Sequence, residues 1–235
     1  MTERTDLVKP SDVRLERVLD AAAELLLRWG YQKVTIDEVA RQAGIGKGTV
    51  YLHFPNKEAL FLTVLLRAQW RSLAPIIGRI RDDAAEALPS RVLRTGYLQV
   101  AADPVLRALY LGDAEVLGRL THEAAHTLGA LAELRRRALR DHIALLREAG
   151  CLRTDLDVDA QVHVLQAVGI GFFFIDTLPG SPVEQAVRAD LLAGTVSAAL
   201  EVPDPPLDAV PVEAVIALYT PVLDQFREEW RRRVR

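Results

Sequence analysis

The stretch Thr35–Lys57, TIDEVARQAGIGKGTVYLHFPNK, predicts two short helices joined by a glycine turn. Thr35 and Glu38 form a T-x-x-E pattern, in which a hydroxyl and a carboxylate each bind a free backbone N–H at a helix start. Gly44 follows this first helix and supplies the left-handed residue that ends it. Short helices joined in this way are typical of a helix-turn-helix, the supersecondary unit that reads DNA. The apolar face of the first helix is Ile36, Val39, Ala40 and Ala43.

The second helix is expected from about Lys47 to His53, and its outer surface is small and polar. Gly48 leaves the backbone of this helix uncovered, so the helix can approach a phosphate chain closely. Val50 and Phe54 are expected to be buried and to hold the helix to its scaffold.

The segment GIGKGTVYLHFPNKEAL, residues 44–60, resembles the signature of the TetR/AcrR family of bacterial transcription regulators. The resemblance covers roughly residues 14–61, about a fifth of the chain. Gly46 stands where the family usually has a Ser or Thr that caps the recognition helix, so this cap is weaker. Leu52 occupies a position that is often polar, which suggests contact with a thymine methyl group.

The resemblance implies a set of DNA contacts. Lys47 is expected to reach a base edge or a phosphate, and Lys57 adds charge at a helix N-terminus that already favours an anion. Phosphate contacts that set the register are expected from Thr49, Tyr51 and His53. The complete expected set is Thr35, Lys47, Gly48, Thr49, Tyr51, Leu52, His53 and Lys57.

The charge of the chain is unevenly distributed. The net charge is −3, but Arg28–Lys57 holds five basic and two acidic residues and therefore carries +3. A small basic head on an acidic body suits a protein that binds DNA at one place and repels it elsewhere. Compaction of DNA without sequence preference, a third class of function, would call for a more basic chain.

A cytoplasmic protein without a membrane span is expected. The longest apolar run, Val168–Ile175, is far shorter than the ~20 residues that a membrane helix needs. The N-terminal residues MTERTDLVKPSD lack the apolar core of a signal peptide. The single cysteine, Cys151, excludes an internal disulfide framework.

Capping residues and prolines divide the remainder into amphipathic helices, and no alternating strand pattern of useful length is present. The predicted fold is all-α: an N-terminal three-helix helix-turn-helix DNA-binding head, a larger helical ligand-binding and dimerisation body, and an extra C-terminal helix after a proline-rich connector. The head is assigned to residues 1–56, the body to 57–200, and the connector with its helix to 201–235. Helices are expected at about 11–29, 57–80, from Ser90, from Asp103-Pro104, at 121–149, at 158–177, from Ser181-Pro182 to 200, and at 212–233. The last helix carries an apolar stripe and should pack on its own body or on a partner chain.

HEAAH at His122–His126 matches the H-E-x-x-H pattern of zinc peptidases. Two histidines one turn apart could bind zinc with Glu123 as general base, but Ala132 stands where the extended pattern would place a third histidine. Ordinary helix-start chemistry is favoured. No catalytic residue, metal or cofactor is assigned, and the alternative is a helical small-molecule-binding protein or metal-dependent hydrolase with a vestigial helix-turn-helix.

The helices at 158–177 and 183–200 contain several glycines and alanines, which favour close packing. The family resemblance implies that these helices of two subunits form a four-helix bundle in a homodimer. An unidentified small-molecule effector is expected in the body, and His163 and Asp176 are expected at the solvated surface. The candidate pocket residues are Trp70, Tyr97, Tyr110, His126, Gln166 and Phe173. The arginine triplets at 135–137 and 231–233 are expected to be solvated helix faces.

Overall fold

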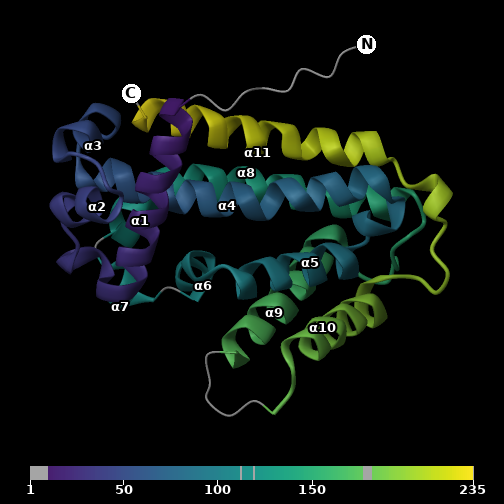
Figure 1. Cartoon of the computed structure of the whole chain (residues 1–235). Coiled ribbons are helices and arrows are strands. Elements are labelled where there is room, and N and C mark those ends of the chain that lie inside the picture. The colour runs from purple at the N-terminus through teal and green to yellow at the C-terminus, as the bar shows by residue number, and fades with distance from the viewer. Residues whose placement is uncertain (1–9, 112, 119, 177–181, 235) are drawn as a thin grey trace.

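The computed structural model of the protein describes residues 10–111, 113–118, 120–176 and 182–234, without the side chains of 10–12, 114 and 121–128. The described residues contain helices and no strand, which confirms the all-α prediction (Figure 1). The α-helices are α1 (Pro10–Lys33), α2 (Ile36–Gln42), α3 (Lys47–His53), α4 (Lys57–Asp82), α5 (Pro89–Ala102), α6 (Pro104–Leu111), α7 (Ala114–Leu117), α8 (Leu120–Glu148), α9 (Val158–Ile175), α10 (Gln185–Leu200) and α11 (Val212–Arg233). Two short 3₁₀ helices, η1 (Ala84–Ala87) and η2 (Leu207–Ala209), lie between them.

Helices α1, α2 and α3 form the head, and α1 packs against both α2 and α4. Gly30 interrupts α1 with a φ of 73°, so the regular helix ends near the predicted position and a further turn continues to Lys33. A Cβ atom on Gly30 would lie 2.3 Å from the carbonyl oxygen of Glu115 in α7. Glycine is therefore required both by the left-handed backbone and by the close approach of α7.

Helix α4 is the central element, because its 26 residues contribute to two hydrophobic cores. Leu60 and Leu65 belong to the core of the head, whereas Leu66 and Ile80 belong to the core of the body. Asn56 caps the helix, and its Oδ1 accepts a hydrogen bond from the N–H of Ala59 at 2.7 Å. The helix is therefore a continuous connection between the head and the body (Figure 1).

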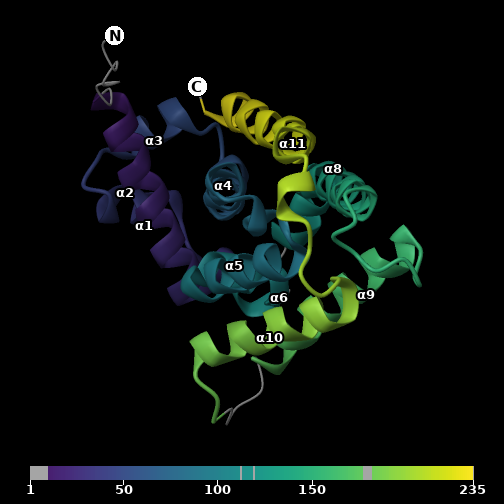
Figure 2. The ribbon, with the colours of Figure 1, turned by 90° about the vertical axis from the view of Figure 1, so that its right-hand side faces the viewer.

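The body places α9 and α10 on the side of the molecule away from α11, as both ribbon views show (Figures 1 and 2). Helix α10 packs along α5, and α9 contacts α8 and α10. A residue distant in sequence caps the start of α5. The N-cap residue of α5 is Leu88, whose side chain forms no capping hydrogen bond. Instead, the buried carboxylate of Glu201 accepts a hydrogen bond from the N–H of Ser90 at 2.8 Å.

Helix α11 packs on its own chain, alongside α4 and α8 (Figure 2). Its predicted apolar stripe is buried, with Val215, Tyr219 and Phe226 between 0% and 8% exposed. The Tyr219 hydroxyl lies 2.9 Å from Nδ1 of His142 in α8, and burial lowers the pKa of His142 to about 4. At the other end of α11, Trp230 and Val234 pack against the core of the head. The last helix therefore spans the body and reaches the head.

By length and apolar composition alone, α4 and α9 could cross a membrane. In α4, 72% of the apolar window is buried inside the protein, as expected of the core helix of a soluble domain. In α9 the buried share is 22%, and Ile170, Phe174 and Ile175 are exposed.

Candidate nucleic-acid interface

The start of α2 is held by the predicted capping box. The backbone N–H and the hydroxyl of Thr35 each donate a hydrogen bond of 2.8 Å to Glu38 Oε2, and the N–H of Glu38 donates to Thr35 Oγ1 at 3.3 Å. Gly44, with a φ of 67°, follows the helix as expected. Thr35 is exposed, so its hydroxyl lies at the positive end of the α2 dipole, where an anion is favoured.

Helix α3 is anchored by two buried residues, since Val50 and Phe54 are both 0% exposed. Gly46 is its N-cap, at the position expected from the sequence, and has no side chain to cap the helix. Tyr51 is 43% exposed and Leu52 is 70% exposed, and the polar residues around them are exposed or half-buried. The helix therefore presents a short surface on a rigid base.

Lys47 opens α3 with an ion pair to α2. Its ammonium lies 2.8 Å from Asp37 Oδ2, and both side chains remain more than half exposed. The hydrogen bond to Asp37 raises the pKa of Lys47, so the lysine stays charged. An exposed pair of this kind contributes little to stability. A phosphate can therefore compete with Asp37 for this ammonium at small cost.

Gly48 faces open space, because a Cβ atom built on it would meet nothing within 4 Å. Packing inside the chain therefore does not require glycine at this position. Its φ is not in the left-handed region, and glycine costs about 0.5–1 kcal/mol relative to alanine within a helix. The absence of a side chain is consistent with close approach by another molecule.

Lys57 lies at the start of α4, next to the capped N-terminus. Its ammonium is 4.4 Å from the centroid of the Tyr31 ring and donates to the carbonyl oxygen of Gln32 at 3.5 Å. These contacts hold the Lys57 ammonium at the junction between α1 and α4. A phosphate at this junction could bind both the ammonium and the start of α4.

Three of the predicted pocket residues are brought together in the body. The ring of Phe173 lies 5.4 Å from that of Tyr97 and 6.1 Å from that of Tyr110, measured between centroids. The guanidinium of Arg135 lies 5.9 Å from the Tyr110 ring. The aromatic cluster thus joins α5, α6 and α9, with α8 supplying a cation.

Asp176 lies beside this aromatic cluster, although the sequence predicts it at the solvated surface. It accepts a short hydrogen bond from the hydroxyl of Tyr97 and forms an ion pair with Arg188 at 3.0 Å. Burial, followed by this hydrogen bond, raises the pKa of Tyr97 to about 12. No local pattern predicts this pairing, because Tyr97 and Asp176 are 79 residues apart.

The other predicted pocket residues lie elsewhere. Trp70, 39% exposed, lines a cleft with α11 rather than the aromatic cluster. Gln166 is exposed on α9. The side chain of His126, like the whole His122–His126 motif, lies outside the described residues. Among the side chains that are described, no three His, Cys, Asp or Glu residues form a group that could hold a metal ion.

Comparison with known proteins gives matches to the N-terminal region. A family described as "Bacterial regulatory proteins, tetR family" matches residues 18–64. The fatty acid metabolism regulator protein of Bacillus subtilis (strain 168) is 31% identical over 70 residues, 30% of this chain and 34% of that protein. The HTH-type transcriptional activator FasR of Mycolicibacterium smegmatis is 41% identical over 58 residues, 25% of this chain and 26% of its own. The match thus covers about a third or less of the length of these relatives.

Solved structures extend the similarity of fold to most of the chain. NalD, the secondary repressor of the MexAB-OprM multidrug efflux pump in Pseudomonas aeruginosa, superposes with a TM-score of 0.62 at 18% identity, over 82% of this chain and 98% of its own. FadR from Bacillus subtilis in complex with stearoyl-CoA gives a TM-score of 0.57 at 17% identity, over 77% and 96%. KstR2 of Mycobacterium tuberculosis, a ketosteroid transcriptional regulator, gives 0.57 at 21% identity, over 81% and 96%.

Proposed function

The chain belongs to the TetR family of bacterial regulatory proteins, and from this premise we propose that it is a cytoplasmic, ligand-responsive repressor that binds a near-palindromic operator as a homodimer. The observation that carries the proposal is the surface of α3. It combines a buried anchor, an open glycine and an exposed leucine on a helix-turn-helix. The open glycine and the exposed leucine suit contact with the DNA groove and have no evident role in packing.

The proposed DNA contacts divide into positioning and reading. Thr35, Thr49, Tyr51 and His53 bind phosphates, together with Lys57 at the start of α4. On α3, the ammonium of Lys47 exchanges Asp37 for a phosphate or a base edge, Gly48 permits close approach, and Leu52 contacts a thymine methyl group.

The homodimer is proposed to form through α9 and α10. Both helices expose large apolar side chains, and a contiguous exposed apolar patch marks an interaction surface. Gly171 and Gly194, also exposed, have open space where a Cβ would stand and permit close helix contact with a partner subunit. The exposed apolar residues are Ile170, Phe174 and Ile175 on α9, and Val187 and Leu191 on α10.

The effector is proposed to bind at the aromatic cluster of Tyr97, Tyr110 and Phe173. Aromatic walls with a few orienting polar groups, here Asp176 and Arg135, suit an apolar or aromatic ligand. The stearoyl-CoA complex of a protein of similar fold supports a ligand with a large apolar part. A ligand that binds better in the state unable to fit DNA must weaken DNA binding by the same coupling energy, typically about 1–3 kcal/mol.

For these roles we keep the boundaries expected from the sequence. Residues 1–56, with Lys57 at the start of α4, bind DNA, residues 57–200 bind the effector and dimerise, and residues 201–235 supply the connector and the last helix. We assign to α4 the coupling between the effector site and the DNA-binding head, because α4 contributes to the cores of both head and body.

Selection of bound sequences from a random DNA pool tests the proposal. We expect an inverted repeat whose half-sites are centred about one helical turn, or a multiple of it, apart. The protein should bind it as a dimer or a multiple of dimers in light scattering. Selection of a single non-repeated half-site bound by a monomer would contradict the dimer, and enrichment of no sequence would contradict the operator.

A further inference from the structure

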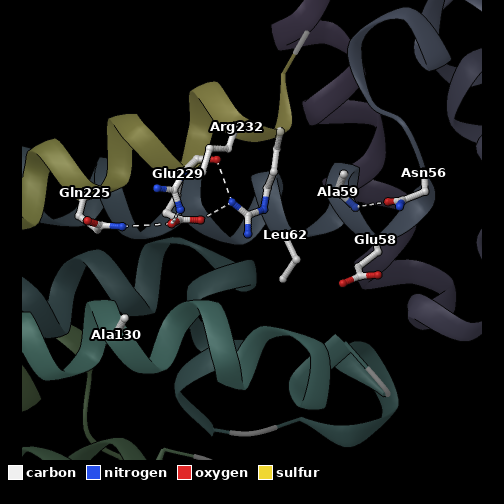
Figure 3. A pocket seen from close by; sticks show the side chains of 9 residues that line it. Asn56, Glu58, Ala59, Leu62, Ala130, Gln225, Glu229 and Arg232 are labelled. Carbon is white, nitrogen blue, oxygen red and sulfur yellow. Dashed lines mark hydrogen bonds and ion pairs between the residues drawn. The ribbon is translucent and has the colours of Figure 1, made fainter.

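Two clefts flank the C-terminal half of α11, and they differ in chemistry. The first, which we call the carboxylate cleft, lies between α4, α8 and α11 and measures about 530 Å³ (Figure 3). In it, the buried Glu229 carboxylate accepts hydrogen bonds from Gln225 at 3.0 Å, from Arg232 at 3.2 Å and from Arg233. Because both arginines of this cleft are paired with Glu229, the cleft offers no unpaired cation to an anionic ligand.

The second cleft, which we call the arginine cleft, lies between α1, α4 and α11 and measures about 340 Å³. Its lining has a regular pattern, because an apolar residue followed by arginine occurs twice on α4 and twice on α11, four residues apart each time. Residues four apart lie on one face of a helix, so each helix presents two apolar side chains and two guanidinium groups to the cleft. On α4 the pairs are Leu66-Arg67 and Trp70-Arg71, and on α11 they are Phe226-Arg227 and Trp230-Arg231.

Most of these arginines already have a carboxylate. Arg67 is buried and lies 2.9 Å from Glu16 and 2.8 Å from Asp20, two residues of α1. Arg71 shares Glu16 at 2.9 Å but is 51% exposed. On α11, Arg227 lies 3.2 Å from Asp224, and both of these side chains are exposed. Four guanidinium groups therefore meet three carboxylates.

Arg231 carries the remaining positive charge. Its side chain is exposed, and it forms no ion pair with any carboxylate of the described residues, whereas both arginines that follow it on α11 are paired. Arg231 and Arg71 together offer partly solvated donors at the rim of the cleft. Its walls include the rings of Trp70, Phe226 and Trp230. Guanidinium groups bind carboxylates and related anions through paired N–H donors, and aromatic walls bind flat apolar groups.

We propose that the arginine cleft is a second small-molecule site, distinct from the aromatic cluster of the body, that takes an organic anion with an aromatic or apolar body. The apolar part lies against the tryptophan rings, and the anionic group binds Arg231 and Arg71. A ligand in this position contacts α1, α4 and α11 together, beside the Arg67 ion pairs that join the head to α4.

A pair of fluorescent dyes tests the charge requirement directly. 1-Anilinonaphthalene-8-sulfonate carries an anionic group on two aromatic units, and N-phenyl-1-naphthylamine has the same aromatic units without the sulfonate. The rise in dye emission on titration gives each affinity, and variants of residues that line the cleft test whether the dye binds there. The full-length protein, without DNA, is expected to bind the sulfonate dye at least several-fold more tightly than the neutral dye.

Three variants locate the dye. Arg231→Gln should weaken the sulfonate dye about tenfold, as expected for loss of one charge-assisted contact, and should change neutral-dye binding less than twofold. Trp70→Leu should weaken both dyes. Arg232→Gln, on the same turn of α11 but in the carboxylate cleft, is the matched control and should change neither by more than twofold. Thermal melting verifies that each variant is folded.

The proposal is overturned if Arg231→Gln leaves the sulfonate dye unaffected, or if Arg232→Gln weakens it equally, since the effect would then be general electrostatic attraction. It is also overturned if Trp70→Leu changes neither dye. None of these results depends on operator binding, so failure of this site leaves the proposed regulation of DNA binding unaffected.

Discussion

Helices α3 and α9 both expose apolar side chains, but in different patterns. On α3 a single large aliphatic residue, Leu52, is 70% exposed, and polar residues surround it. On α9, Ile170, Phe174 and Ile175 are each more than half exposed, and α9 contacts α10, which also exposes apolar residues.

The two patterns suit different partners. An isolated exposed leucine is common on protein surfaces and can contact a small apolar feature such as a thymine methyl group. A continuous apolar face requires another apolar surface to cover it, and a second copy of the same two helices supplies one. The number and arrangement of exposed apolar groups thus distinguish the surface proposed to read DNA from the surface proposed to bind a second subunit.

The largest effect is expected from a charge placed in the apolar face of α9. Phe174→Asp should convert the dimer to a monomer, because an aspartate buried in this interface would have no partner. Operator affinity should then fall by about 100-fold or more, since the two heads no longer bind together. Light scattering and DNA titration measure the two effects. Thr220→Asp, at an exposed position of α11, should change neither; a dimeric Phe174→Asp would place the interface elsewhere.

A smaller effect is expected on α3, from Gly48→Ala. The added methyl group meets no atom of the chain, so thermal stability should stay the same or rise by up to about 1 kcal/mol. The methyl group should hold the helix away from the DNA backbone and so remove about one phosphate contact. Operator affinity should therefore fall by roughly tenfold.

Gly129→Ala is the matched control for that change, because Gly129 is also exposed within a helix and also faces open space. It should stabilise the protein without altering DNA binding. If Gly48→Ala binds the operator as tightly as the unchanged protein, α3 does not approach the DNA closely at this position.

Leu52→Ala should relax the preference at one base pair by about 1 kcal/mol, roughly fivefold. The log–log salt dependence of binding should not change, because no charge is lost. Selection of bound sequences with both proteins measures the change. If both proteins select the same site, the exposed leucine does not read a base, and the exposed apolar residue of α3 has no role in specificity.

The smallest effect is expected at the polar rim of α3. Asp37→Asn removes the partner of Lys47, which is then free to bind DNA, and operator affinity should rise by about threefold, the scale of an exposed ion pair. Asp155→Asn removes a similar exposed pair with Arg153, away from the head, and should have no effect. Weaker binding by Asp37→Asn would indicate that Asp37 positions Lys47 for DNA rather than competing for it.

The parts of the fold that were predictable depend on contacts between near neighbours in the chain. The capping box of Thr35 and Glu38 and the cap on Ala59 by Asn56 each span three residues. Gly44 was predictable because a helix stop needs its left-handed backbone. The head and the main helices of the body follow from such local signals.

The remaining features depend on contacts that no local pattern encodes. The pairing of Asp176 with Tyr97 and the bond from Ser90 to Glu201 join residues 79 and 111 positions apart. The same limit applies to Trp70, whose neighbours in the arginine cleft come from both ends of the chain. The candidate DNA surface is encoded in one local motif. For the aromatic cluster the sequence predicted Tyr97, Tyr110 and Phe173, but not Asp176, whose pairing with Tyr97 needs the tertiary structure.

The packing of α11 on α4 has a consequence for the order in which the protein forms during synthesis. About 130 residues separate the end of α4 from the start of α11, so the ribosome makes α11 long after α4. Until then, the side of α4 that α11 will bury stays open, and contacts this distant in sequence form slowly because a long loop must close. We expect the nascent chain to fold its N-terminal head early, whereas the body is completed only after α11 has been synthesised.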